Sequence, residues 1–93
     1  MPSVRIPTPL RRLTRDKDEV SISASTISQL VDKLEEEFPG IKERICDENG
    51  NLRRFINLYV NNEDIRFMNG MDTPLKETDT VSIIPAIAGG LKS

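Results

Sequence analysis

The residues whose types and spacing could support chemistry form the C-terminal end of this 93-residue sequence. They are a slender run of small side chains: Ala86, Ile87, Ala88, Gly89 and Gly90. Because glycine has no Cβ, a narrow channel in another protein can close around its backbone. Such a segment, held mainly through main-chain hydrogen bonds, can present a carboxylate to an enzyme that activates it by attaching a leaving group. Taken alone, two adjacent glycines near a terminus also fit a merely flexible end.

The rest of the sequence offers little other chemistry. It contains no histidine and a single cysteine, Cys46, so a histidine-containing catalytic triad, a metal site built from several thiolates and an internal disulfide are all excluded. We therefore expect no catalytic activity of the chain's own, no bound metal and no bound cofactor. Cys46 is expected to be a semi-buried apolar filler, because no pattern of basic neighbours would lower the pKa of its thiol.

Composition predicts one small cytoplasmic domain. Hydrophobic residues make up 37% and charged residues 30% of the sequence, which suits a single domain with a modest core. The 13 basic and 15 acidic residues leave a net charge of -2, so neither nucleic acid nor a membrane is the expected partner. The N-terminus has no signal-peptide pattern, and no apolar run approaches the roughly 18 residues of a membrane span.

Two segments near the N-terminus, 4–7 and 19–23, alternate apolar and polar residues. This period of two predicts a pair of strands. The proline-containing, polar stretch between them predicts a hairpin closed by a long loop.

An amphipathic helix is predicted after the hairpin, since apolar residues recur there at helical spacing: Ile27, Leu30, Val31, Leu34 and Phe38. Thr26 and Gln29 can cap its first amides, and the pair at 39–40, proline then glycine, ends it. Three consecutive glutamates, 35–37, are expected on its solvated side.

The second half of the chain is expected to contain, in order, a short helical turn at 41–46, a surface loop at 47–51, a strand at 55–60, a turn at 61–64, a short partner segment at 65–67 and a last strand at 80–85. This order predicts an α+β domain in which one helix covers one face of a mixed sheet of four to five strands. If the first and last strands lie side by side they run parallel, as in a β-grasp. We expect residues 1–85 to form this domain and residues 86–93 to be a flexible tail.

Three features together carry a resemblance to a known family: the order ββαβββ, the stretch RFINLYVN at 54–61, and the ending DTVSIIPAIAGG at 79–90. On these the sequence resembles, over nearly its whole length, the MoaD/ThiS family of ubiquitin-like sulfur carrier proteins. The segment 53–67 is most similar to the carriers that deliver sulfide for cysteine synthesis.

The resemblance implies chemistry at the carboxylate of Gly90. A ubiquitin-activating-type adenylyltransferase, using ATP and Mg, would recognise residues 86–89 and adenylate that carboxylate, and a sulfur donor would then replace the adenylate to leave a thiocarboxylate. In the most similar carriers the acceptor is an activated serine or homoserine derivative on a cysteine-synthase-type enzyme that uses pyridoxal phosphate. The chain would be the co-substrate of these enzymes.

Other roles remain open at this point. Within the carrier class, molybdopterin or thiamin synthesis could receive the sulfur. A ubiquitin-like modifier joined to lysines of target proteins would use the same tail and the same activation. A β-grasp RNA-binding or scaffold module would make the glycine pair incidental.

The sequence departs from the commonest family pattern, because Leu91, Lys92 and Ser93 follow the second glycine. With them present the Gly90 carbonyl is an amide, which an adenylating enzyme cannot use. Hydrolysis of the Gly90–Leu91 bond would expose the carboxylate, and the resemblance suggests that a separate, zinc-dependent deubiquitinase-like metalloprotease makes this cut. Trimming by a nonspecific peptidase and an artificial extension are the alternatives.

Two further groups of residues are ambiguous in the sequence. The first comprises five arginines, which form either a solvated face or a docking patch for an acidic partner: Arg11, Arg12, Arg15, Arg53 and Arg54. No aromatic residues interleave with them, which argues against nucleic acid. The second comprises apolar residues that alternation alone cannot assign to the core or to a docking surface: Phe55, Leu58, Tyr59, Phe67 and Ile84.

Overall fold

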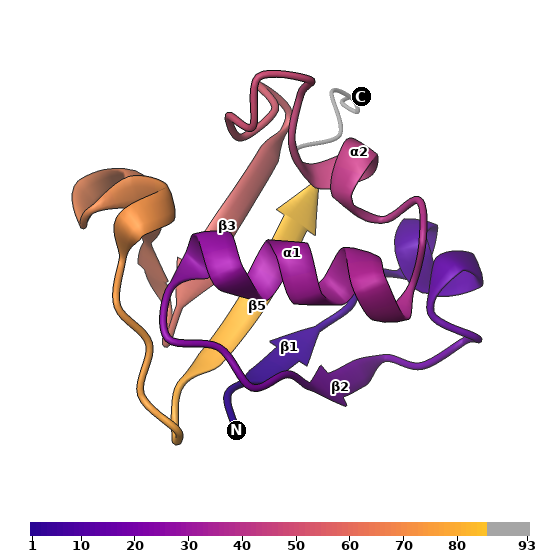
Figure 1. Ribbon diagram of the computed structural model, residues 1–93, viewed down its shortest axis with the longest axis horizontal. Helices are drawn as coiled ribbons and strands as arrows, with labels where there is room; N and C mark the ends of the chain where they lie inside the picture. The colour runs from indigo at the N-terminus through magenta and orange to yellow at the C-terminus, as the bar shows by residue number, and fades with distance from the viewer. Residues whose placement is uncertain (86–93) are drawn as a thin grey trace.

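The computed structural model describes residues 1–85, so the predicted tail, 86–93, lies outside the described residues. Within them the chain forms one five-stranded mixed sheet in the order β2-β1-β5-β3-β4, with the helix α1 lying across one face (Figure 1). The predicted α+β arrangement, a mixed sheet crossed by one main helix as in a β-grasp, is confirmed.

The predicted N-terminal hairpin is confirmed, and it supplies one edge of the sheet. Strand β1 (Ser3–Arg5) pairs antiparallel with β2 (Glu19–Ser21) and parallel with β5 (Thr80–Pro85). The long loop contains a 3-10 helix, η1 (Thr8–Leu13), that the sequence pattern did not reveal. Leu10 of this helix is buried, so the loop closes one end of the core.

Helix α1 (Ile27–Glu37) has the predicted N-terminal cap and the predicted apolar stripe. The hydroxyl of Thr26 accepts a hydrogen bond from the Gln29 amide, and the Gln29 side chain accepts one from the Ser25 amide. The expected apolar stripe faces the sheet, and all five of its residues are buried: Ile27, Leu30, Val31, Leu34 and Phe38. Gly40, at φ +101°, supplies the left-handed backbone needed for the chain to turn into the short helix α2 (Lys42–Ile45).

The second hairpin differs from the prediction. Strand β3 (Ile56–Val60) pairs with β4 (Glu63–Asp64), which lies inside the stretch expected to be the turn. The turn needs only two residues, because Asn61 and Asn62 both adopt positive φ, 51° and 79°, as two-residue hairpin turns require.

The segment expected to pair with β3, residues 65–67, is instead a 3-10 helix, so that prediction is wrong. This helix, η2 (Ile65–Phe67), begins where the Asp64 side chain accepts a hydrogen bond from the Arg66 amide. Its first residue, Ile65, is only 1% exposed. Burial of Ile65 and the cap at Asp64 therefore end the ladder early.

A single core lies between α1 and the sheet. Besides the helix stripe it contains buried residues from the strands and α2, among them Val4, Val20, Ile45, Leu58, Val60, Val81 and Ile83. Another 3-10 helix, η3 (Gly70–Asp72), leads into the connection to β5. Leu58 thus belongs to the core, whereas Phe55, Phe67 and Ile84 are exposed and Tyr59 is half-buried.

Candidate functional site

The described residues lead to the predicted reactive end through strand β5. Val81 and Ile83 are buried on the helix side, which leaves Ser82 and Ile84 on the opposite face because strand side chains alternate. The last residue of the strand, Pro85, is opposite Ile56 of β3. The six residues proposed for activation, recognition and cleavage all follow this point and lie outside the described residues: Ala86, Ile87, Ala88, Gly89, Gly90 and Leu91.

The end of β5 is held firmly in the middle of the sheet. Strand β5 pairs antiparallel with β3 over five residue pairs, from Val60 and Val81 to Ile56 and Pro85, so its end is held by β3. Strand β1 pairs in parallel with the first half of β5, Thr80 to Ser82. Proline has no amide hydrogen to donate to a ladder, so it suits the terminal position of a strand. The chain therefore leaves the domain from a fixed point.

Two exposed apolar side chains flank this exit. Ile84, next to Pro85, is 44% exposed, and Phe55, which comes directly before Ile56, is 59% exposed. Both are large hydrophobic residues that the fold leaves in contact with water. They lie at the end of the sheet from which the reactive end departs, which makes them candidates for contact with a partner.

A positive charge is fixed beside these two residues. The Arg66 guanidinium donates from Nη2 to the Ile56 carbonyl at 2.9 Å and from Nη1 to the Asn57 side chain. Asn57 is directly opposite Ile84 in the ladder. The Arg66 side chain is still 42% exposed, and its Nη1 lies 3.9 Å from Asp64 Oδ2. Arg66 is thus an oriented cation next to Ile84.

No local pattern around Arg66 predicts a functional role for it. Its side chain reaches β3 only because the turn at Asn61 and Asn62 is short enough to fold η2 back along the strand. A recognisable signal was the pair of asparagines, which favours a two-residue hairpin turn.

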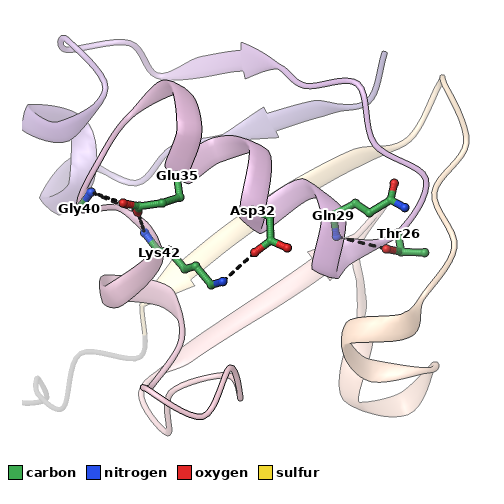
Figure 2. Close-up of polar contacts among 6 residues, drawn as sticks. All are labelled: Thr26, Gln29, Asp32, Glu35, Gly40 and Lys42. Atoms are coloured by element: carbon green, nitrogen blue, oxygen red, sulfur yellow. Dashed lines mark hydrogen bonds and ion pairs between the residues drawn. The ribbon is translucent and has the colours of Figure 1, made fainter.

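The glutamates of α1 divide into two groups in the structure. Glu36 and Glu37 are exposed as expected, but Glu35 is partly buried and has a structural role. Its carboxylate accepts hydrogen bonds from the Gly40 amide at 3.1 Å and the Lys42 amide at 2.9 Å (Figure 2). These two bonds, the one from the Lys42 amide foremost, lower the pKa of Glu35.

A second contact ties α2 to α1. Lys42 Nζ lies 2.7 Å from Asp32 Oδ1 (Figure 2), and this hydrogen bond raises the pKa of Lys42. Helix α2 in turn holds the segment leading to β3, since the Arg53 amide donates to the Ile45 carbonyl at 2.9 Å. The polar contacts at the end of α1 therefore help to position Phe55 beside the exit.

Three of the five ambiguous arginines make separate local contacts. Arg11 donates from Nε to the Ile6 carbonyl, and Arg53 donates from Nε to the Glu43 carbonyl. The Arg15 guanidinium lies 6.0 Å from the centroid of the Phe38 ring. Arg12 and Arg54 are exposed. Of the five, Arg54 is the one adjacent to Phe55.

Cys46 is a buried filler, as expected. Its side chain is only 1% exposed, and burial raises the pKa of its thiol, which disfavours the reactive thiolate. It borders a shallow, open depression of about 670 Å³ whose rim carries charges of both signs, including Glu35, Lys42 and Arg53. Among residues 1–85, no group of three or more His, Cys, Asp or Glu side chains could hold a metal ion.

Comparison with known proteins decides the family. The ThiS family matches residues 4–90 of the chain, which includes the glycine pair. The chain belongs to the ThiS family.

Among the described residues, no helix is long and apolar enough to cross a membrane.

Three relatives of this ThiS-family chain are informative. The sulfur carrier protein CysO of Mycobacterium tuberculosis is 44% identical over 90 residues, which cover 95% of this chain and 97% of the relative. A crystal structure of the Amycolatopsis orientalis BexX/CysO complex contains a chain of 42% identity, with a TM-score of 0.91 over 97% of this chain and 100% of that one. Small archaeal modifier protein 3 of Haloferax volcanii is 32% identical over 66 residues, 71% of each chain.

Proposed function

We propose that this ThiS-family chain is a sulfur carrier whose working group is the carboxylate of Gly90, and that its sulfur is used to make cysteine or a related amino acid. The observation that carries the proposal is the 44% identity to CysO over 95% of the chain, with the match to the family extending through Gly90. The chain is a co-substrate rather than an enzyme. It acts in the cytoplasm.

The first step activates a group that is otherwise unreactive. The Gly90 carboxylate attacks ATP in the site of a ubiquitin-activating-type adenylyltransferase, which supplies Mg, and pyrophosphate leaves. A sulfur donor then attacks the acyl adenylate and displaces AMP, leaving a thiocarboxylate. This chain contributes a tail long enough to enter the enzyme's active site, since the five residue steps from Pro85 to Gly90 extend at most about 17 Å.

The slender side chains of residues 86–89 let the enzyme's channel close around the backbone. Bulky side chains there would obstruct entry, whereas Ala86, Ala88 and Gly89 would not. Ile87 gives the channel one apolar side chain to recognise. Discrimination between this carrier and others must then come partly from the folded domain.

Activation requires a free carboxylate on Gly90, and the sequence continues to Ser93. We infer that a deubiquitinase-like metalloprotease hydrolyses the Gly90–Leu91 bond, with its zinc activating the attacking water. The cut converts the Gly90 amide into the carboxylate that ATP can activate. The extension thereby keeps the newly made chain inactive.

The thiocarboxylate then serves as the sulfur nucleophile. An activated serine or homoserine derivative, bound to a pyridoxal-phosphate cysteine-synthase-type enzyme, loses its leaving group and accepts the sulfur. The product is first a thioester between Gly90 and the sulfur of the new amino acid. Transfer of the acyl group from that sulfur to the amino group gives an amide, which proteolysis hydrolyses to release the amino acid and regenerate the Gly90 carboxylate. The test is to incubate the thiocarboxylate form with such a synthase and the activated serine. A cysteine adduct on Gly90 is expected in the intact mass, and its absence with an active synthase would contradict this assignment.

A second candidate, a protein modifier, rests on a weaker match. The 32% identity to small archaeal modifier protein 3 covers 71% of the chain, less than the match to CysO. A modifier would be joined through Gly90 to lysines of other proteins. Recovery of lysine-linked conjugates from cells, in the absence of any thiocarboxylate form, would favour that function over sulfur transfer.

A further inference from the structure

The surface around the exit of the tail combines apolar and cationic side chains. We define the exit patch as Arg54, Phe55, Arg66 and Ile84. Phe55 and Ile84 are 59% and 44% exposed, and Arg54 and Arg66 are exposed cations. Aromatic residues and arginine are the types most often found at the energetic centre of protein interfaces.

Three members of the patch, Phe55, Arg66 and Ile84, are linked through shared neighbours, and Arg54 directly precedes Phe55 in the sequence. Ile84 is opposite Asn57 in the ladder, and Asn57 accepts a hydrogen bond from Arg66. Arg66 also donates to the carbonyl of Ile56, the residue that follows Phe55 and pairs with Pro85. These contacts hold the cation in one place before any partner arrives, which reduces the ordering cost of binding.

The length of the tail limits how far the active site of an enzyme that acts on Gly90 can lie from the exit patch. Gly90 is five residue steps beyond Pro85, so an enzyme acting on it must bring its reactive centre within about 17 Å of Pro85. An enzyme surface that surrounds a buried active site must then come close to the domain at the end of β5. The exit patch lies at that end of the domain, because Ile84 adjoins Pro85 and Ile56, which follows Phe55, pairs with Pro85.

We propose that the exit patch is the docking site for the enzyme that adenylates Gly90. The surface of that enzyme in contact with the patch is apolar and carries a carboxylate that faces Arg66. The inference rests on the proposed function, because it requires a reaction at Gly90. Ile84 and Phe55 supply apolar contact area, whereas Arg66 supplies an oriented partner for a carboxylate, a geometry to which the planar guanidinium is suited. Docking at the patch lowers KM for the carrier and leaves the chemical step unchanged.

Two variants of a chain ending at Gly90 separate the apolar from the charged contribution. Ile84→Thr and Arg66→Gln are each expected to raise KM for the carrier about tenfold, equivalent to about 1.4 kcal/mol, with kcat unchanged in pyrophosphate exchange. The effect of Arg66→Gln is expected to shrink as salt is added, because ions screen exposed charges. The effect of Ile84→Thr is expected to persist. Arg66→Lys, which keeps the charge, is expected to recover part of the loss.

Two exposed residues that are not members of the exit patch serve as matched controls. Phe67→Ser removes a more exposed apolar side chain, 82% exposed, from η2. Lys33→Gln removes a positive charge beside Met1 and Pro2, at the start of β1, which pairs with the start of β5 rather than its end. Both controls are expected to keep the KM of the unaltered chain. Thermal unfolding of every variant checks that it is folded at the assay temperature.

The outcomes distinguish this inference from the function on which it rests. If folded Ile84→Thr and Arg66→Gln keep the KM of the controls, or lower kcat instead, the docking role is overturned while the carrier function stands. If Arg66→Gln does not fold, Ile84→Thr and Arg54→Gln decide the question. If the unaltered chain is not adenylated by an enzyme that is active on its own carrier, the proposed function fails and the docking role fails with it.

Discussion

At the scale of the residue, the function proposed here depends on one carboxylate. The proposed function places that group on the second glycine, Gly90, and in this sequence three residues follow it. An amide carbonyl at Gly90 cannot attack ATP as a carboxylate does, so the state of the Gly90–Leu91 bond decides whether the carrier can be activated.

The first prediction concerns this bond. A chain ending at Ser93 is expected to support no pyrophosphate exchange above background with the activating enzyme, whereas a chain ending at Gly90 supports it fully. Addition of the metalloprotease to the longer chain is expected to restore exchange. Equal rates for the two chains without protease would show that residues 91–93 do not withhold the reactive group.

A second prediction concerns Glu35. Two backbone amides hold the pKa of this carboxyl below its ordinary value of 4.5. A lowered pKa in the folded state contributes stability that is complete above the ordinary value and is lost as pH falls through the folded value. Glu35→Gln removes this titration, so its thermal unfolding midpoint is expected to depend less on pH between neutral pH and about pH 3.

Glu36→Gln is the matched control for Glu35, because Glu36 is exposed on the same helix. It is expected to retain the acid dependence of the unaltered protein. If Glu35→Gln and Glu36→Gln lose stability in parallel as pH falls, the carboxylate of Glu35 does not hold the turn between α1 and α2.

At the scale of the element, the turn between β3 and β4 sets the position of Arg66. The two asparagines both have positive φ, and within residues 1–85 only Asn61 forms side-chain hydrogen bonds to the neighbouring connection. Its Nδ2 donates to Asp79 Oδ1 at 2.8 Å, and its Oδ1 accepts from the Thr80 amide at 2.9 Å.

The third prediction compares two substitutions in that turn. Asn61→Gly is expected to cost about 1–3 kcal/mol of unfolding free energy, since it removes both side-chain hydrogen bonds. Asn62→Gly is expected to change stability by less than about 1 kcal/mol, because glycine readily adopts positive φ. Denaturant unfolding of the two variants measures the difference. Equal losses would show that the backbone conformation, rather than the Asn61 side chain, holds the turn.

Local patterns predicted most of the elements. The stripe of α1 and its stop at Pro39 and Gly40 required only helical spacing and local chemistry, and the first and last strands followed from alternation. The boundary of β4 was missed, because burial of Ile65 and capping by Asp64 compete with strand pairing. No local pattern indicates which of several such contacts will form.

The same limit applies to the candidate site. Residues 86–91 could be proposed because the resemblance to a family of sulfur carriers gave a role to small side chains and a glycine pair that, taken alone, also fit a flexible end. The roles of Glu35 and Arg66 depend on contacts with residues distant in sequence or across a turn. Arg66 reaches Ile56, ten positions away, and only the folded hairpin brings the two together.

At the scale of the whole molecule, one face of β5 packs in the single core and the other face carries the exposed Ile84. Adjacent residues there have opposite roles, since Ile83 is 2% exposed and packs in the core while Ile84 is 44% exposed at the exit. The strand therefore couples the stability of the domain to the presentation of the tail.

The fourth prediction uses this adjacent pair. Ile83→Ala is expected to lower the free energy of unfolding by about 2–5 kcal/mol, as large-to-small changes in a core do. Ile84→Ala is expected to lower it by about 1 kcal/mol or less and to raise KM for the activating enzyme. Chemical denaturation and pyrophosphate exchange on the same samples test both effects. A large loss of stability in Ile84→Ala would place its side chain in the core instead.

The central claim is that the Gly90 carboxylate becomes a thiocarboxylate. Its most direct test is the intact mass of a chain ending at Gly90 after incubation with its activating enzyme, ATP and a sulfur donor. We predict the mass change of one oxygen replaced by sulfur, dependent on ATP and absent from a chain that lacks Gly90. No mass change with an enzyme shown to be active, or the same change in the chain without Gly90, would contradict the account.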